Sequence, residues 1–394
     1  MLPSITDNTK QFCMTEPNKV LVEQILQDAA YILQRNCRAL ENKKYSAIPF
    51  YTEQDVYRML NKTKTYEENK IHKLNEYVSF EFVPSGHIVG ATVIILYIKT
   101  LTGQIKKIVY TGDMSSPNNH QPYCKEQTLI NKANVIITEA TYSDLNRCYK
   151  KCDIELEREK MKKDIKNEIK KGNSILFPAF AMSRTQNLLT FLFKTFHDDK
   201  TFDTPIYLDG KLSLMINDCY KQILDDEDRK EFEKVLEWDK LHFVKSYEDS
   251  LNLALRKDLR HITISSNGMV QVGRIMSHVK ANVENEKYTI MFIGYCAENT
   301  IGSMLRNPNT KSVKIEGLEY KKNCNIYSYS TWSSHIQGHE LIEWFKGVHS
   351  DKIIIHHSDD SKYKFRDIAQ EELMKCNKTT PIVCADDENN IFFI

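Results

Sequence analysis

The stretch Phe82–Ser115, FVPSGHIVGATVIILYIKTLTGQIKKIVYTGDMS, decides how the rest of the chain is interpreted. Its apolar runs Thr92–Ile98 and Ile108–Tyr110 flank a Thr-Gly turn signal, a pattern typical of a β-hairpin. His87 follows a Pro-Ser-Gly turn before the first run, and Asp113 follows a Thr-Gly turn after the second. Glycine lets the backbone bend sharply at such turns. We therefore expect two potential metal ligands at the ends of neighbouring strands.

The bulk composition is that of an ordinary globular protein. The 394 residues predict two or three domains, with 41% apolar and 27% charged residues. The chain has 54 Lys and Arg residues against 53 Asp and Glu residues, a net charge of +1. No overall basic field therefore points to nucleic acid, although a net charge near zero is compatible with a local basic groove. The ten cysteines form no CxxC pair, which favours reduced thiols. Without a signal peptide or an apolar run of about 20 residues, we expect a cytoplasmic protein and no membrane contact.

Two N-terminal segments predict helices that serve packing. Residues 15–35 carry a plausible N-cap at Thr15 and apolar residues at every fourth position. Tyr51–Leu60 has Thr52 as its cap and Asp55 three residues later, a variant of the capping box. Residues 147–171 predict a further amphipathic helix, whose charged face we interpret as solvated rather than as an RNA-binding patch.

Residues 150–310 repeat a strand-turn-helix pattern. Apolar runs that predict buried strands recur at Ser174–Phe180, Thr204–Asp209, Ile262–Gly268 and Tyr288–Gly294. Helices are predicted after Ser183 and from about Val270. The repeat indicates a parallel α/β domain, in which ligands bind beyond the carboxyl ends of the strands.

Three further candidate ligands also follow predicted strands. Within Ala133–Tyr142 an apolar strand leads into Glu139. His335 follows Ile326–Ser334, and His356-His357 follow Lys352–Ile355. Side chains alternate along a strand, so at most one of the two adjacent histidines faces the site. Each residue alone is more often a surface or structural residue than a ligand. Together with His87 and Asp113 they form an imidazole and carboxylate set suited to zinc or manganese. A pair of such ions supports phosphodiester hydrolysis.

Other enzyme classes lose support because the sequence contains no P-loop, no G-x-S-x-G and no G-x-G-x-x-G. Eight motifs instead follow one another along the chain: PSGHIVGA (84–91), YTGDMS (110–115), ITEATY (137–142), LFPAFAMSRTQNLL (176–189), ISSNGMVQVGRI (264–275), FIGYCAENTIGSML (292–305), WSSHIQGHEL (332–341) and IIHHSDD (354–360). In this order they resemble the β-CASP branch of the metallo-β-lactamase fold. That branch includes ribonuclease J, the endonuclease subunit of the mRNA cleavage and polyadenylation complex, and short bacterial and archaeal exonucleases.

The resemblance implies an α/β protein built on a metallo-β-lactamase αββα sandwich with an inserted β-CASP α/β domain. The implied boundaries are residues 1–146 for the metallo-β-lactamase part, lacking its first strands, 147–320 for the β-CASP domain, and 321–394 for the return to the first domain. RNA would pass between the two domains.

The resemblance also implies roles for individual residues. His87 and His357 would each ligate one of two divalent ions, zinc or alternatively manganese, and Asp113 would bridge them. Glu139 would orient the site, and His335 would donate a proton to the leaving oxygen, a task that suits histidine near neutral pH. Loops that line the RNA channel would hold phosphates without reading sequence. The residues that match these loops are Ser265, Ser266, Gly268, Gly294 and Thr300.

This chain departs from the family pattern in three places. It contains no H-x-H-x-D-H run, the family's main metal loop, and its first residues resemble the segment that follows that loop. We interpret this as N-terminal truncation, and expect weak metal binding because each ion would have about two protein ligands. Ser303 and Gln337 replace the family's arginine and aspartate, which predicts weaker positioning of the phosphate and of His335.

The sequence therefore predicts a metal-dependent hydrolase of the RNA nuclease type. The alternative is a catalytically impaired or inactive β-CASP fragment or scaffold, and a related hydrolase acting on DNA or a small phosphodiester stays open. Single-stranded RNA is the expected partner, with a homodimer or a complementing chain as further expectations. The residues do not distinguish endonuclease from exonuclease activity.

Overall fold

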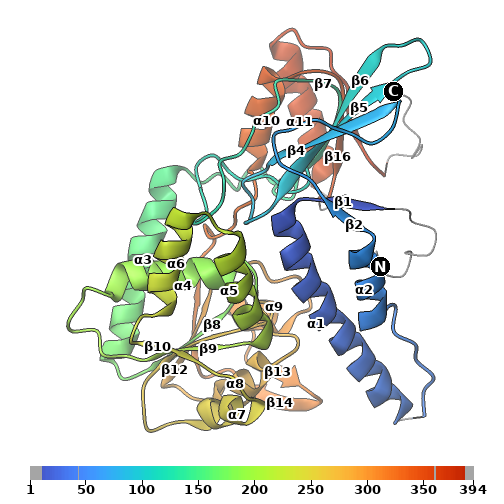
Figure 1. The fold of residues 1–394 in the computed structure, drawn as a ribbon. Coiled ribbons are helices and arrows are strands. Elements are labelled where there is room, and N and C mark those ends of the chain that lie inside the picture. Colours follow the sequence, from blue (N-terminus) through green and yellow to red (C-terminus); the bar gives the residue numbers. More distant parts are fainter. Residues whose placement is uncertain (1–10, 43, 359–360, 387–394) are drawn as a thin grey trace. The chain divides into compact units, whose positions relative to one another are not determined.

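The computed structural model describes residues 11–42, 44–358 and 361–386, arranged as two compact units (Figure 1). Unit 1 comprises Met1–Lys150 and Ser334–Ile394, and unit 2 comprises Lys151–Ser333. Residues 1–10, on which part of the predicted truncation depends, lie outside the described residues, as do Asp359 and Asp360 of the last motif. No helix of the described chain is both long and apolar enough to cross a membrane.

Unit 1 is built on a seven-stranded sheet whose strand order is β17-β16-β7-β6-β5-β4-β3. Its strands are β3 (His72–Lys73), β4 (Val78–Pro84), β5 (Thr92–Lys99), β6 (Ile105–Tyr110), β7 (Lys132–Glu139), β16 (His349–His356) and β17 (Ile382–Cys384). The predicted hairpin is confirmed, since β5 and β6 pair antiparallel with Ile95 opposite Val109. From β6 to β17 the neighbours run parallel, so β6, β7 and β16 all deliver their last residues to the same edge.

Two helices cover one face of this sheet, α10 (Gly338–Gly347) and α11 (Lys362–Lys375). Fully buried Leu341 and Phe345 of α10 and Phe365 of α11 belong to one apolar cluster with the sheet residues Val109 and Ile136. On the opposite face a smaller cluster is formed by Ile108, Val135 and Ile354 with half-buried neighbours. Among the described residues, unit 1 therefore contains one large sheet with helices on one face.

A helical hairpin precedes this sheet in unit 1. It consists of α1 (Glu16–Glu41) and α2 (Glu53–Asn61), flanked by the short parallel strands β1 (Phe12–Met14) and β2 (Thr63–Thr65). Both predicted caps are confirmed. The Thr15 hydroxyl accepts the Asn18 N–H, and Thr52 and Asp55 form a reciprocal capping box.

Unit 2 is a parallel α/β domain with the strand order β10-β9-β11-β8-β12-β15. Its sheet strands are β8 (Ser174–Pro178), β9 (Ile206–Asp209), β10 (Leu241–Phe243), β11 (Ile262–Ser265), β12 (Tyr288–Phe292) and β15 (Asn325–Ser328), and β13 (Ser312–Ile315) and β14 (Leu318–Lys321) form a separate hairpin. Its helices are α3 (Lys151–Lys170), α4 (Arg184–Phe196), α5 (Lys211–Ile223), α6 (Asp226–Leu236), α7 (Tyr247–Leu255), α8 (Ile275–Asn282) and α9 (Ile301–Arg306). Apolar clusters on both faces bury the central strands, as in other parallel sheets.

The parallel α/β prediction for this region is confirmed, with two local differences. The helix expected from about Val270 begins at Ile275, because Val270 and Gly273 adopt positive φ angles of 56° and 89° that a helix cannot accommodate. The strand expected to reach Ser334 ends at Ser328 and pairs with β12. Residues 321–333 lie in unit 2 together with this strand.

Candidate metal centre

The loop that carries His87 is held against the loop that carries Asp113. The Ser115 N–H donates to the Ser85 carbonyl at 3.0 Å, directly beside Gly86. Gly86 has a φ of +72°, and a Cβ on it would meet Ser115 Oγ at 2.5 Å. The close approach of the two loops therefore needs glycine at this position. It places His87 and Asp113 side by side, as the sequence predicts.

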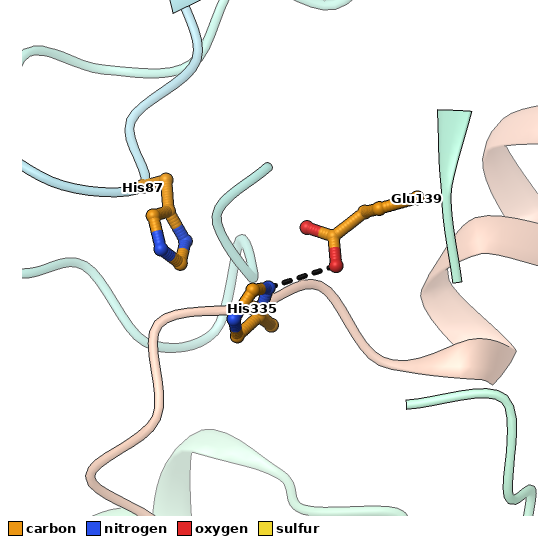
Figure 2. Close-up of side chains that lie close together, drawn as sticks. All are labelled: His87, Glu139 and His335. Atoms are coloured by element: carbon orange, nitrogen blue, oxygen red, sulfur yellow. Dashed lines mark hydrogen bonds and ion pairs between the residues drawn. The ribbon is translucent and has the colours of Figure 1, made fainter. Parts of the chain in front are cut away.

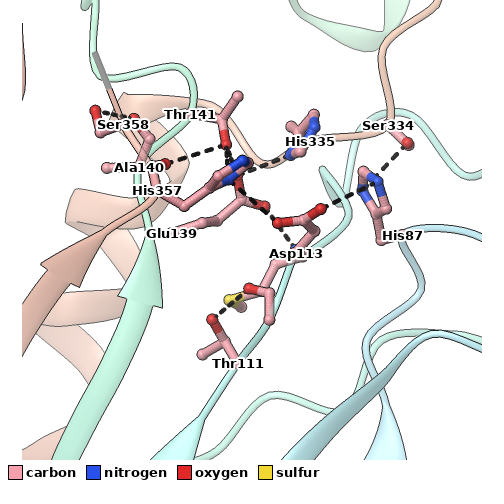
Figure 3. A network of polar contacts seen from close by, with 12 residues as sticks. His87, Thr111, Asp113, Glu139, Ala140, Thr141, Ser334, His335, His357 and Ser358 are labelled. Atoms are coloured by element: carbon pink, nitrogen blue, oxygen red, sulfur yellow. Dashed lines mark hydrogen bonds and ion pairs between the residues drawn. The ribbon is translucent and has the colours of Figure 1, made fainter. Parts of the chain in front are cut away.

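Pairing of distant segments brings the remaining site residues to the same place. His335 pairs with Ser115 as an isolated β-bridge, which joins the segment before α10 to the loop after β6. On the other side, the Ala140 N–H donates to the His357 carbonyl at 3.4 Å, where β7 and β16 end together. Figure 3 shows the resulting cluster.

Asp113 lies between two histidines, and each carboxylate oxygen faces one of them. Oδ2 is 3.8 Å from His87 Nε2, and Oδ1 is 3.4 Å from His357 Nδ1. Two ligand atoms bound to one tetrahedral zinc ion at roughly 2.1 Å lie roughly 3.4 Å apart. The two gaps are therefore of the size that a shared cation needs, and the nitrogen and carboxylate donors suit zinc or manganese. Within the described residues, His87, Asp113 and His357 would offer each of two such cations two protein ligands.

Glu139 is fully buried, and hydrogen bonds occupy both of its carboxylate oxygens. Oε1 accepts the Met114 N–H at 2.6 Å, and Oε2 lies 2.8 Å from His335 Nδ1 (Figure 2). The Thr141 hydroxyl also donates to Oε2. By distance, Glu139 belongs to two groups that could hold a metal, with His87 and His335 or with Asp113 and His357. Three groups, from Met114, His335 and Thr141, already bond its two oxygens.

Thr141 links Glu139 to His357. Its Oγ1 bonds Glu139 and lies 3.1 Å from His357 Nδ1 and 3.4 Å from the His357 carbonyl oxygen. His357 itself has a φ of 50°, unusual for a residue other than glycine, and its side chain is 55% exposed. The hydroxyl therefore helps to fix an exposed imidazole in a strained part of the backbone.

His356, the other member of the histidine pair, points away from this cluster. Its ring stacks on Tyr110 with centroids 5.0 Å apart, and burial lowers the pKa of its imidazole. Burial and the neighbouring Asp113 carboxylate raise the pKa of Tyr110. As strand alternation predicts, one of the two histidines faces the site.

Comparison with known proteins shows what this chain is similar to. Residues 185–305 match the family model described as the Beta-Casp domain. The chain is 24% identical to Integrator complex subunit 11 of Danio rerio over 94% of its own length and 60% of the relative's. It is 24% identical to Ribonuclease TTHA0252 of Thermus thermophilus and 28% identical to Probable RNase MJ4 of Methanocaldococcus jannaschii, covering 88% of this chain and 75% of each relative.

The chain is similar to proteins of the β-CASP branch of the metallo-β-lactamase fold over most of its length, and residues 185–305 match the Beta-Casp domain itself. The α/β fold class is confirmed as well. Proteins of this branch use divalent metal ions, which agrees with the donor set around Asp113.

The predicted phosphate-binding residues lie at the carboxyl edge of the unit 2 sheet. Their hydroxyls are largely used within the unit. Ser265 Oγ donates to the Asp209 carbonyl, Thr300 Oγ1 donates to the Ala297 carbonyl, and the Ser266 and Ser213 hydroxyls are 3.0 Å apart. A Cβ on Gly268 would meet Phe180 at 3.2 Å, and one on Gly294 would meet it at 3.8 Å.

Two residues that touch the candidate site residues were not predicted. Thr141 is one, and Ser334 is the other, with its Oγ 3.3 Å from His87 Nδ1. The one feature of the sequence that could have pointed to them is their position, since each lies within two residues of a predicted site residue.

The Gln337 side chain forms two hydrogen bonds with the main chain of Tyr149. Its amide donates to the Tyr149 carbonyl at 2.9 Å and accepts the Tyr149 N–H at 2.7 Å. These bonds therefore connect two segments of unit 1: the one that ends at Lys150 and the one that begins at Ser334.

Proposed function

We propose that this chain is a metal-dependent hydrolase of the RNA nuclease type, cleaving phosphodiester bonds of single-stranded RNA. The observation that carries the proposal is the placement of Asp113 between His87 and His357, with the Glu139–His335 pair beside it. The names of two relatives add support, because they describe ribonucleases. The chain spans about 60% of the length of Integrator complex subunit 11. An activity of that whole relative therefore applies to this chain only as a proposal.

In the proposed site, His87, His357 and Asp113 would hold the divalent ions, with the Asp113 carboxylate shared between them. Zinc is the proposed metal and manganese the alternative. The ions supply an activated water and stabilise charge on the phosphate oxygens. The chain's own residues position the reaction.

Glu139 fixes His335 with its Nδ1 toward the carboxylate. The second ring nitrogen is then left to give a proton to the leaving oxygen, a contribution that is typically worth 10²- to 10⁴-fold in rate. We further propose that Ser265, Ser266, Gly268, Gly294 and Thr300 line the path of the RNA. Since most of their hydroxyls bond within the unit, their backbone groups are the better candidates for phosphate contacts.

The test is cleavage of a labelled single-stranded RNA by the purified chain with millimolar Zn²⁺ or Mn²⁺, with and without a chelator. We expect cleavage that the chelator abolishes and that His335→Asn lowers by about 100-fold or more. His349→Asn is the matched control, since His349 is an exposed histidine at the opposite end of β16. Equal losses in both variants, or cleavage that survives chelation, would contradict the proposal.

The second candidate is a catalytically impaired or inactive β-CASP fragment or scaffold. The observation that favours it is the count of two protein ligands per ion in the described set, where zinc sites have three or four. RNA binding without cleavage at saturating metal would support this candidate. The comparisons support neither a homodimer nor a complementing chain, and these and the cytoplasmic location stay predictions from the sequence.

A further inference from the structure

The imidazole ring of His335 is held by one hydrogen bond and packs against two other rings. Its Nδ1 lies 2.8 Å from Glu139 Oε2. Its ring centroid lies 4.3 Å from that of His87 and 5.7 Å from that of Tyr142, whose ring plane is turned by 85°. These are the separations of favourable ring pairs. Because the last torsion of a histidine side chain is soft, the direction of Nε2 depends on these ring contacts as well as on Glu139.

Tyr142 is held in turn by the guanidinium group of Arg147. The Arg147 Cζ atom lies 3.8 Å from the centroid of the Tyr142 ring, well inside the range of cation–π contacts. The main chain of Tyr142 is fixed separately. It forms an isolated β-bridge with Gln337, and a Cβ on Gly338 would meet the Tyr142 carbonyl oxygen at 2.9 Å. The main chain therefore sets where the Tyr142 side chain starts, and Arg147 packs against the face of its ring.

Arg147 also packs against a second tyrosine, with its Cζ atom 4.9 Å from the centroid of the Tyr149 ring. The Gln337 side chain bonds both the N–H and the carbonyl of Tyr149, which fixes the main chain there. The contacts therefore form a continuous series within unit 1. In order, its members are Gln337, Tyr149, Arg147, Tyr142 and His335.

This series gives Gln337 a role that the sequence did not predict. Gln337 in place of the family's aspartate was expected to weaken the positioning of His335. In the structure it instead anchors Tyr149, against which Arg147 packs. A different arginine–tyrosine pair of unit 1 serves as a reference. Arg366 Cζ lies 5.7 Å from the Tyr363 ring on α11, and the Tyr363 hydroxyl bonds Asp386 rather than a site residue.

We propose that Arg147 and Tyr142 are positioning residues for His335. Arg147 holds the Tyr142 ring, and that ring holds the imidazole so that Nε2 faces the leaving oxygen. Neither residue touches the RNA or the reacting atoms in this role. The inference rests on the proposed function, because the transfer of a proton from His335 is part of that function.

The test is a double-mutant cycle on RNA cleavage by the full chain. Arg147→Leu and Tyr142→Leu should each lower kcat by about 10- to 100-fold with KM unchanged, the usual cost of misplacing a reacting group by about 1 Å. In the His335→Asn background the same changes should cause no further loss, because they act only through His335. Tyr142→Phe keeps the ring and should retain the wild-type kcat. Arg366→Leu removes a guanidinium from the reference pair and should change nothing.

Equal losses from Arg147→Leu in the wild-type and His335→Asn backgrounds would overturn the inference, since they would show an effect that bypasses His335. A rise in KM with kcat unchanged would overturn it in favour of substrate binding by Arg147. Unchanged thermal unfolding of each variant shows that its fold is retained.

A second measurement separates this inference from the proposed function. The chain is labelled with ¹³C at histidine Cε1, and the His335 signal is identified by its loss in His335→Asn. Arg147→Leu and Tyr142→Leu should shift and broaden this signal, whereas Tyr142→Phe and Arg366→Leu should leave it in place. If the wild-type chain does not cleave RNA, the proposed function fails, and this signal alone decides whether Arg147 and Tyr142 fix the ring. A His335 signal that is identical in wild type and Arg147→Leu would show that they do not.

Discussion

At the scale of single residues, Gly86 sets the distance between the loops that carry His87 and Asp113. Gly86→Ala forces a side chain into a positive φ and brings it 2.5 Å from Ser115 Oγ, so we expect a loss of about 2 kcal/mol in the free energy of unfolding. Gly103→Ala is the control, since Gly103 has a φ of +85° with nothing within 4 Å, and about 1 kcal/mol is expected there. Urea unfolding measures both, and equal losses would show that crowding at Ser115 is unimportant.

Thr141 supports a second prediction at this scale. Thr141→Val keeps the shape of the side chain but removes the hydroxyl between Glu139 and His357. Loss of a residue that orients a metal ligand typically lowers metal affinity or activity by about 10- to 100-fold. We expect that loss in metal titrations and in RNA cleavage. Thr141→Ser should restore most of it, and a serine variant as weak as the valine variant would point to packing instead.

Sequence alone could predict those residues of the candidate site whose side chains are uncommon at strand ends. Histidine and carboxylate residues at strand ends attract attention in a sequence, and all five of those proposed lie together in the structure. Thr141 and Ser334 escaped because hydroxyl residues are common and become informative only when folding brings them beside Glu139 or His87.

At the scale of elements, the predictions from the sequence agree best with the structure where contacts between near neighbours in the chain determine the conformation. The caps at Thr15 and Thr52 depend on residues three positions away, and both were predicted. The start of α8 was placed too early, because the preceding loop adopts positive φ angles at Val270 and Gly273 that no local pattern reveals. The membership of β15 in unit 2 depends on its pairing with β12, a tertiary contact.

A buried carboxylate connects the elements at the carboxyl edge of unit 2. Asp209, at the end of β9, is fully buried and accepts hydrogen bonds from Ser250 at 2.6 Å and from Arg274 at 2.8 Å, with His278 Nε2 at 2.7 Å. Burial by itself would raise its pKa, but the bonds from these three side chains outweigh burial and leave the pKa below its ordinary value of 3.8. Asp209 therefore ties α7, α8 and the loop before α8 to the sheet.

This cluster predicts a pH-dependent stability. Asp209→Asn should lower the free energy of unfolding by about 3 kcal/mol at neutral pH, because it leaves buried partners of the carboxylate unsatisfied. A carboxylate with a lowered pKa stabilises the folded state above its unfolded value, and that contribution is lost as pH falls through its folded value. The difference between wild type and variant should thus be constant above about pH 5 and shrink below about pH 3.8. Denaturant titrations from pH 3 to 8 measure it, and a difference independent of pH would contradict the assignment.

At the scale of the whole molecule, the metal content of the chain is the most direct test of the alternative functions. With two protein ligands for each ion, we expect weak Zn²⁺ binding that a chelator of modest affinity reverses. Calorimetric titration of the purified 394-residue chain measures this. Two tight sites per chain would contradict the prediction and would require ligands beyond His87, Asp113 and His357. Asp113→Asn should weaken both sites together if this carboxylate is shared.

The division of the molecule into units was readable in outline. The pattern of residues 150–310 predicted a parallel α/β region, and unit 2 contains that parallel sheet. The exact borders depend on the pairing of β15 with β12 and on the hydrogen bonds between Gln337 and Tyr149. Both are tertiary contacts, which local sequence patterns do not reveal.

The parallel pairing of β7 with β16 has a consequence for how the chain folds during synthesis. About 210 residues separate the end of β7 at Glu139 from the start of β16 at His349, and all of unit 2 lies between them. At 5–20 residues per second, a ribosome needs roughly 10–40 s to deliver β16. Throughout that time the outer edge of β7, in the middle of the finished sheet, has no strand to pair with. The nascent chain therefore passes through a period in which an apolar strand edge is open to aggregation or to chaperones, while unit 2 is already able to fold.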